Sequence, residues 1–222
     1  MIDRPRYATP ESLPDILPIF PLPGAVLLPY GRMPLNIFEP RYLTMLDDVM
    51  KSEHRLIGMI QPKAGQQNAG DPVLQTIGCA GRLTSFTETS DRHYMISLTG
   101  ICRFNVQEVH NGFLPYATGD IIWDQFQPDL RPAQAEPAFD RPRFLAVLER
   151  YFQVMELSTD WESLKDADDA MLINALAMLC PFSPEEKQAL LETPTLMRRC
   201  ETLITLMEFA LRENTGSKGT LQ

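Results

Sequence analysis

Two hydrophobic periodicities divide the chain into an N-terminal part and a C-terminal part. Between residues 94 and 99, Tyr94, Ile96 and Leu98 alternate with Met95, Ser97 and Thr99, which is the period-two pattern of a half-buried strand. After residue 142, apolar residues recur at helical spacing, most clearly in Phe144, Leu145, Leu148, Tyr151, Phe152 and Met155. The pattern therefore predicts a β-rich first part and a helical second part.

The stretch from Leu17 to Val49 predicts two extended segments that lead into a helix. Five prolines exclude a helix interior here and favour sheet edges: Pro18, Pro21, Pro23, Pro29 and Pro34. Glu39-Pro40 predicts a helix start, because proline is favoured at the first helical position and an acidic residue suits the positive end of the helix dipole. Tyr42 and the apolar residues that follow at helical spacing predict one buried face.

Further strands are predicted up to residue 125. Residues 56–60 form a short apolar run that predicts a buried strand, and residues 61–72 have the composition of a flexible, solvated loop. Residues 74–88 and 93–109 predict an antiparallel pair with a bulge or bend at Gly100, and residues 115–123 predict a closing strand. About six strands with proline-blunted edges predict a closed or nearly closed barrel.

A composition change separates this part from the helices. Four prolines lie in residues 126–142, which indicates a connection between domains. We therefore expect a β-rich domain over residues 12–125, a Pro-rich linker over 126–137 and a helical domain over 138–213. Four helices are predicted there, with an acidic N-terminal cap at residues 166–169, a capping box at Ser183-Pro184-Glu185-Glu186 and a cap at Thr193-Pro194. The fold class is α+β, with a four-helix C-terminal unit.

Four motifs carry a resemblance to a known family. They are Phe20-Pro21-Leu22 with Leu35 and Ile37-Phe38-Glu39-Pro40-Arg41-Tyr42, then residues 78–83, residues 91–94 with 100–104, and residues 184–192. In this order and spacing, over residues 15–212, the chain resembles the N-terminal, substrate-binding domain of Lon proteases and is thus related to peptidase S16. The resemblance implies that the barrel is PUA-like and that the protein recognises unfolded or degron-bearing polypeptide. A protease or a chaperone is a further candidate partner.

Composition narrows the classes of function. The chain has 222 residues and a formal net charge of −9, and both of its parts are acidic. Affinity for nucleic acid comes mostly from neutralised phosphates, so a nucleic-acid partner is not expected. No apolar run approaches the length of a membrane helix and the N-terminus lacks a signal-peptide pattern, so we expect a cytoplasmic protein without a membrane partner. Four scattered cysteines predict buried, reduced thiols: Cys79, Cys102, Cys180 and Cys200.

The sequence lacks the motifs of several chemistries. It has no Gly-x-x-x-x-Gly-Lys-Ser/Thr loop and no Gly-x-Ser-x-Gly elbow, so neither ATP hydrolysis nor proteolysis is expected. His54, His93 and His110 are isolated in the sequence, without a second histidine or cysteine at ligand spacing. We therefore predict a protein that is not an enzyme and that has neither a catalytic residue, a cofactor nor a metal.

Five residues are candidates for a polypeptide-binding surface. An arginine and a tyrosine ring that border a groove would suit an interface, because these residue types dominate interface energetics. The candidates are Phe38, Arg41, Tyr42, Arg82 and Arg103. The alternative is structural: Glu39 caps the helix and pairs with one arginine, which holds strand to helix. Two other functions also stay open, an RNA-binding PUA-like module and a small-molecule enzyme whose site assembles only in the fold.

Overall fold

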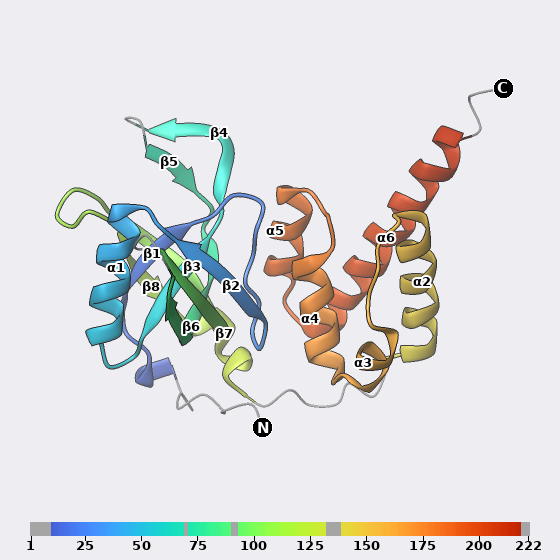
Figure 1. Ribbon diagram of the computed structural model, residues 1–222, viewed down its shortest axis with the longest axis horizontal. Coiled ribbons are helices and arrows are strands. Elements are labelled where there is room, and N and C mark those ends of the chain that lie inside the picture. The colour runs from blue at the N-terminus through green and yellow to red at the C-terminus, as the bar shows by residue number, and fades with distance from the viewer. Residues whose placement is uncertain (1–9, 69–70, 90–92, 132–138, 219–222) are drawn as a thin grey trace.

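The computed structural model describes residues 10–68, 71–89, 93–131 and 139–218. Figure 1 shows a twisted sheet with helix α1 on one side and a group of helices on the other. The first elements along the chain are η1 (Pro10–Ser12), β1 (Ile16–Pro21), β2 (Arg32–Ile37), α1 (Pro40–Lys51) and β3 (Leu56–Ile60). The two predicted extended segments, the helix start at Pro40 and the buried strand at residues 56–60 are thus confirmed.

The sheet is mixed and its pairings form a closed circuit. It is completed by β6 (Ile77–Glu88), β7 (Tyr94–His110) and β8 (Thr118–Ile122), in the order β2-β7-β6-β3-β1-β8. β1 and β3 pair in parallel, and the other pairs are antiparallel. The long strand β7 pairs with β8 as well as with β2 and β6. This additional pairing closes the circuit through β7, β6, β3, β1 and β8.

The register between the long strand β7 and its neighbour β6 shifts along their length. One shift lies where Ala80 pairs with Cys102 and Gly81 pairs with Gly100, next to the bulge predicted at Gly100. A Cβ atom at Gly100 would lie 2.0 Å from the carbonyl oxygen of Leu28, so only glycine fits this close approach of two backbones. A bulge of this kind bends the strand and increases its twist.

Residues 61–72 are more ordered than a loop. They form β4 (Pro62–Asn68) and the beginning of β5 (Asp71–Leu74), which pair as a separate antiparallel hairpin at the top of Figure 1. The prediction of a flexible loop was wrong for the described residues. It depended on the glycine and glutamine content, which does not reveal hydrogen bonds between paired strands. A 3-10 helix, η3 (Asp124–Leu130), likewise occupies much of the described part of the predicted linker.

Five α-helices lie in the described C-terminal residues, one more than predicted. They are α2 (Arg141–Val154), α3 (Trp161–Asp166), α4 (Asp169–Leu179), α5 (Pro184–Glu192) and α6 (Leu196–Lys218). The capping box between Ser183 and Glu186 and the acidic cap at Asp168 are confirmed. The cap of α6 is Thr195, whose Oγ1 accepts a hydrogen bond from Arg198 N, whereas Thr193 ends α5. Helix α6 also extends beyond its predicted end near residue 213.

Two clusters of buried apolar residues hold the described elements together. The larger one joins α1 and one side of the sheet to the C-terminal helices, from Phe20 through Tyr42 and Phe144 to Met207. The smaller one joins the sheet to Leu13, which follows η1, and to η3. The four cysteines are all buried and free, as predicted, and burial raises the pKa of each thiol. No helix in the described ranges combines the length and apolar character that a membrane crossing needs.

Candidate functional site

A surface cleft of about 790 Å³ lies between the start of α1, the hairpin strand β5 and the loop that joins β7 to β8. Its walls come from Ile19 and Pro21 of β1, from residues 72–76, and from Val106, Gln107 and Val109 of β7. Residues of the loop at 111–117 and of the start of α1 supply the rest of the lining. The cleft therefore lies where segments distant in the sequence meet.

Arg41 and Tyr42, two of the candidate binding residues, border this cleft. The Arg41 guanidinium lies 4.5 Å from the centre of the Tyr42 ring and pairs with Glu39, with 2.9 Å between Nη2 and Oε2. Arg41 is half-exposed, whereas Tyr42 is buried and its ring centre lies 4.4 Å from that of Phe20. Burial raises the pKa of Tyr42, and the positive charge of Arg41 partly offsets this effect.

Tyr116 fixes the loop to α1. Its hydroxyl donates a hydrogen bond of 2.8 Å to Oδ2 of Asp48, which lies on α1, and its ring is buried. Burial, the hydrogen bond and the negative charge of Asp48 together raise the pKa of Tyr116 to about 12. The tyrosine therefore stays neutral at physiological pH and holds this loop, which lines the cleft, against α1.

The lining is uncharged except at one position. Arg41 is the charged residue among the described side chains of the wall, and the others are apolar or are neutral hydrogen-bonding groups such as Gln75, Gln107 and Asn111. The described lining contains no histidine, cysteine, lysine or carboxylate that could act as a general base or nucleophile. Such a surface is suited to binding, with apolar contacts and hydrogen bonds to amide groups.

Phe113 is an apolar residue that the sequence analysis did not select. It is 100% exposed, and it lies between Gly112 and Leu114, which both line the cleft. Gly112 has a φ of 91°, a conformation that glycine adopts without steric cost. In the sequence, Asn111-Gly112 is typical of a turn, and nothing there distinguishes Phe113 from an ordinary loop residue.

Three of the five candidate residues lie away from the cleft lining. Phe38 is exposed and its ring centre lies 5.6 Å from that of His93. Arg82 is half-buried on β6. Arg103 is 3% exposed, and its side chain lies in the interior. The structure thus brings Arg41 and Tyr42 together at one site and places the other three elsewhere.

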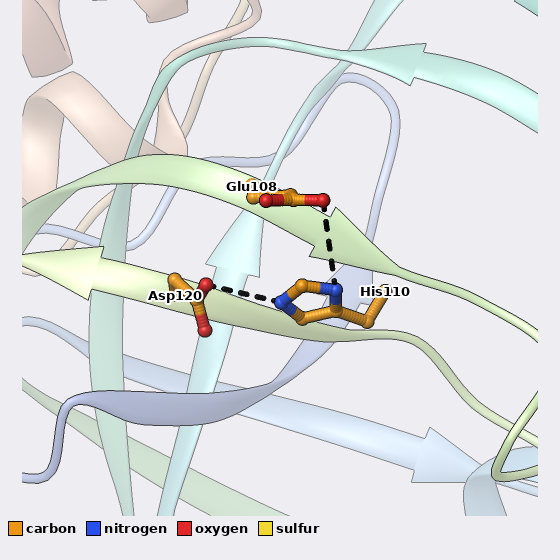
Figure 2. A group of neighbouring side chains, drawn as sticks. All are labelled: Glu108, His110 and Asp120. Atoms are coloured by element: carbon orange, nitrogen blue, oxygen red, sulfur yellow. Dashed lines mark ion pairs between the residues drawn. The ribbon is translucent and has the colours of Figure 1, made fainter.

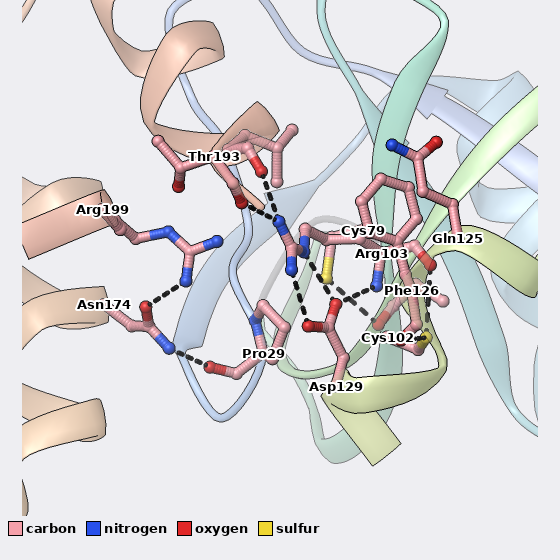
Figure 3. Close-up of polar contacts among 12 residues, drawn as sticks. Pro29, Cys79, Cys102, Arg103, Gln125, Phe126, Asp129, Asn174, Thr193 and Arg199 are labelled. Carbon is pink, nitrogen blue, oxygen red and sulfur yellow. Dashed lines mark hydrogen bonds and ion pairs between the residues drawn. The ribbon is translucent and has the colours of Figure 1, made fainter. Parts of the chain in front are cut away.

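Arg103 joins three elements of the fold (Figure 3). Its Nε and Nη2 donate hydrogen bonds of 2.7 and 2.8 Å to the two carboxylate oxygens of Asp129 on η3. Its Nη1 donates to the carbonyl oxygens of Leu191 and Thr193 at the end of α5. The guanidinium also lies 4.6 Å from the centre of the Phe126 ring. This arginine has the structural role of linking the sheet to the helices.

A second buried arginine, Arg199 on α6, lies in the same region (Figure 3). It donates to the carbonyl oxygen of Leu190 and to Oδ1 of Asn174, and Asn174 donates in turn to the carbonyl oxygen of Pro29. Its Nη2 is buried without a hydrogen-bond partner among the described residues. Burial, with the nearby positive charge of Arg103, lowers the pKa of Arg199 to about 9.

Comparison with known proteins finds Lon proteases and their substrate-binding domain. Residues 16–208 match the family described as the ATP-dependent protease La (LON) substrate-binding domain. The sequence is 26% identical over 207 residues to Lon protease 2 of Myxococcus xanthus, a match that covers 91% of this chain and 24% of that protein. It is also 26% identical over 207 residues to the Lon protease of Anaeromyxobacter dehalogenans. The chain spans about a quarter of the length of these relatives.

Solved structures show the same fold. A Lon N-terminal domain protein from Xanthomonas campestris superposes with a TM-score of 0.58 at 25% identity, covering 86% of this chain and 97% of that one. The N-terminal domain of a Mycobacterium avium complex Lon protease gives a TM-score of 0.61 at 15% identity, with 87% and 98% covered. The mixed sheet and the helices after it are thus shared with both proteins.

Proposed function

Because the chain belongs to the ATP-dependent protease La (LON) substrate-binding domain family, we propose that its cleft binds extended segments of unfolded or degron-bearing polypeptide. The observation that carries this proposal is the cleft itself, which is bordered by Arg41 and Tyr42 and by the loop that carries the fully exposed Phe113. Exposed apolar side chains beside a groove are typical of protein-interaction sites.

The lining suggests how a polypeptide would bind. The cleft has a volume of about 790 Å³, within the range of ligand pockets. A cleft of this size would accept a short segment of polypeptide rather than a folded domain. Gln107 and Asn111 can hydrogen-bond backbone amides of any sequence, whereas Val109 and Leu114 offer apolar contact. Neutral hydrogen-bonding groups beside apolar ones favour broad recognition of exposed apolar segments.

We propose further that this chain binds without catalysing. The described lining supplies no histidine, cysteine, lysine or carboxylate to act as a nucleophile or general base, so we expect the chain by itself neither to hydrolyse ATP nor to cleave casein. We also propose that the closed circuit of strands is a PUA-like barrel and that the protein acts in the cytoplasm, where a protease or chaperone would be a further partner. RNA is not a proposed ligand, since the formal net charge is −9.

Binding of fluorescently labelled, unfolded casein, followed by anisotropy, tests the proposal. Phe113→Ala should weaken binding about tenfold, because exposed aromatic anchors can carry more than 1 kcal/mol of binding free energy. Arg41→Ala should also weaken it, by about threefold to tenfold.

Matched controls come from α6, away from the cleft. Phe209 is 55% exposed, and Arg198 forms an exposed ion pair with Glu201. Phe209→Ala and Arg198→Ala therefore remove a phenylalanine and an arginine side chain from a surface outside the cleft. Both should leave casein affinity unchanged. Equal losses in all four variants, or displacement of casein by an RNA oligomer at physiological salt, would contradict the proposal.

A further inference from the structure

Three side chains with metal-binding atoms meet on the ribbon formed by β7 and β8 (Figure 2). Glu108 and His110 are two residues apart on β7, which places them on the same face of the strand. Asp120 of β8 lies directly opposite Glu108 in the register. One donor atom of each residue lies within 4.8 Å of the others.

The imidazole of His110 lies between the two carboxylates. Its Nε2 is 3.1 Å from Oδ2 of Asp120, and its Nδ1 is 3.9 Å from Oε1 of Glu108. Like charges directly opposite each other on paired strands are destabilising, so the Glu108 and Asp120 pair favours a positive charge between them. A protonated histidine supplies one such charge, and a bound divalent cation would supply two.

We propose that Glu108, His110 and Asp120 form a binding site for a divalent transition-metal ion such as Zn²⁺. One imidazole and two carboxylates are donors that Zn²⁺ accepts, whereas Ca²⁺ and Mg²⁺ prefer oxygen ligands alone. At metal–ligand distances of about 2.0–2.1 Å in tetrahedral geometry, two ligand atoms lie roughly 3.3 Å apart. The distance of 3.1 Å between His110 Nε2 and Asp120 Oδ2 is close to this value.

Glu108 lies nearest Nδ1, the other ring nitrogen, so its side chain must change rotamer to reach an ion held by His110 Nε2 and Asp120. Its side chain is 70% exposed, so a change of rotamer meets little steric resistance. His110 and Asp120 are 44% and 40% exposed, which leaves room for water as the fourth ligand.

The metal site is separate from the cleft. Gln107 and Val109 line the cleft, while Glu108 and His110, which alternate with them along β7, do not. A bound ion would therefore cross-link β7 and β8 behind the wall of the cleft without occupying it. Metal binding can accordingly be tested without a polypeptide ligand.

Isothermal titration with ZnCl₂ tests this inference. We expect one saturable site per chain, with affinity lowered about 100-fold or more in His110→Ala, because a three-ligand site loses its imidazole. Asp120→Asn should weaken binding similarly. His93→Ala removes another exposed histidine and serves as the matched control, and MgCl₂ and CaCl₂ should give no saturable heat.

Paramagnetic broadening by Co²⁺ in amide NMR spectra locates the ion independently. Broadening should be strongest around residues 108–110 and 118–120 in the native protein and absent in His110→Ala, with circular dichroism confirming that the variant is folded. No saturable Zn²⁺ binding, equal affinity in His110→Ala, or broadening centred on the cysteines would overturn the assignment. The three residues would then form a cross-strand ion pair only.

Discussion

The guanidinium of Arg103 and the carboxylate of Asp129 form a two-bond ion pair in the interior, between strand β7 and the 3-10 helix η3. Asp129 also accepts a hydrogen bond from the backbone N of Arg103. Arg199 is a second buried guanidinium nearby. The negative charge of Asp129 therefore acts on two buried positive charges, those of Arg103 and Arg199.

Removal of this carboxylate should be strongly destabilising. We expect Asp129→Ala to lower the free energy of unfolding by about 3–5 kcal/mol, because it leaves buried positive charge uncompensated. Urea unfolding followed by circular dichroism measures the loss. Glu201→Ala breaks an exposed pair with Arg198 and should cost less than about 1 kcal/mol. Similar small costs for both variants would show that the buried pair between β7 and η3 contributes little to stability.

Substitutions of Tyr42 and Arg41 should distinguish a residue that stabilises the fold from one that binds polypeptide. Tyr42 is buried against Phe20, so Tyr42→Ala should cost roughly 3–5 kcal/mol, as for other large-to-small core changes. Arg41 is exposed, and Arg41→Ala should change stability by less than about 1 kcal/mol. Thermal unfolding of both variants tests this difference. If Arg41→Ala were the more destabilising change, its ion pair with Glu39 would be structural and the binding surface would have to lie elsewhere.

Stability should fall in the alkaline range through Tyr116. Its pKa is about 12 in the folded protein, against 10.0 for an unperturbed tyrosine. Because the folded pKa is the higher one, the neutral side chain contributes its full stability below about pH 10, and this contribution is lost as pH rises towards 12. Urea unfolding at pH 8 and pH 11 should show a larger loss in the wild type than in Tyr116→Phe. An equal loss in both would mean that other groups account for the pH dependence.

Local patterns were sufficient to predict most of the fold. The helix start at Pro40, the strand at residues 56–60 and the capping box at Ser183 each depend on neighbouring residues, and all are confirmed. The hairpin of β4 and β5 was missed because its pairing depends on backbone hydrogen bonds rather than on a hydrophobic pattern. The short helix α3 was missed because six residues cannot show a clear helical period. The division into two domains stays a prediction.

The candidate site was predictable only in part. Arg41 and Tyr42 were found because they follow a recognisable helix start, and both border the cleft. Arg103 resembled them in the sequence, but its partner Asp129 is 26 residues away on another element, so its burial could not be foreseen. Exposure of Phe113 and the meeting of His110 with Asp120 also depend on tertiary structure.

Site-specific photo-cross-linking to unfolded casein tests the central claim most directly. A photoreactive amino acid would replace Gln107 or Thr76, which line the cleft and are exposed, or Thr205 on the exposed side of α6 as the control. The account predicts cross-links to casein from the two cleft positions, reduced by Phe113→Ala, and only background from Thr205. Cross-links from Thr205 that equal or exceed those from the cleft would contradict it and would place the binding surface on the helices.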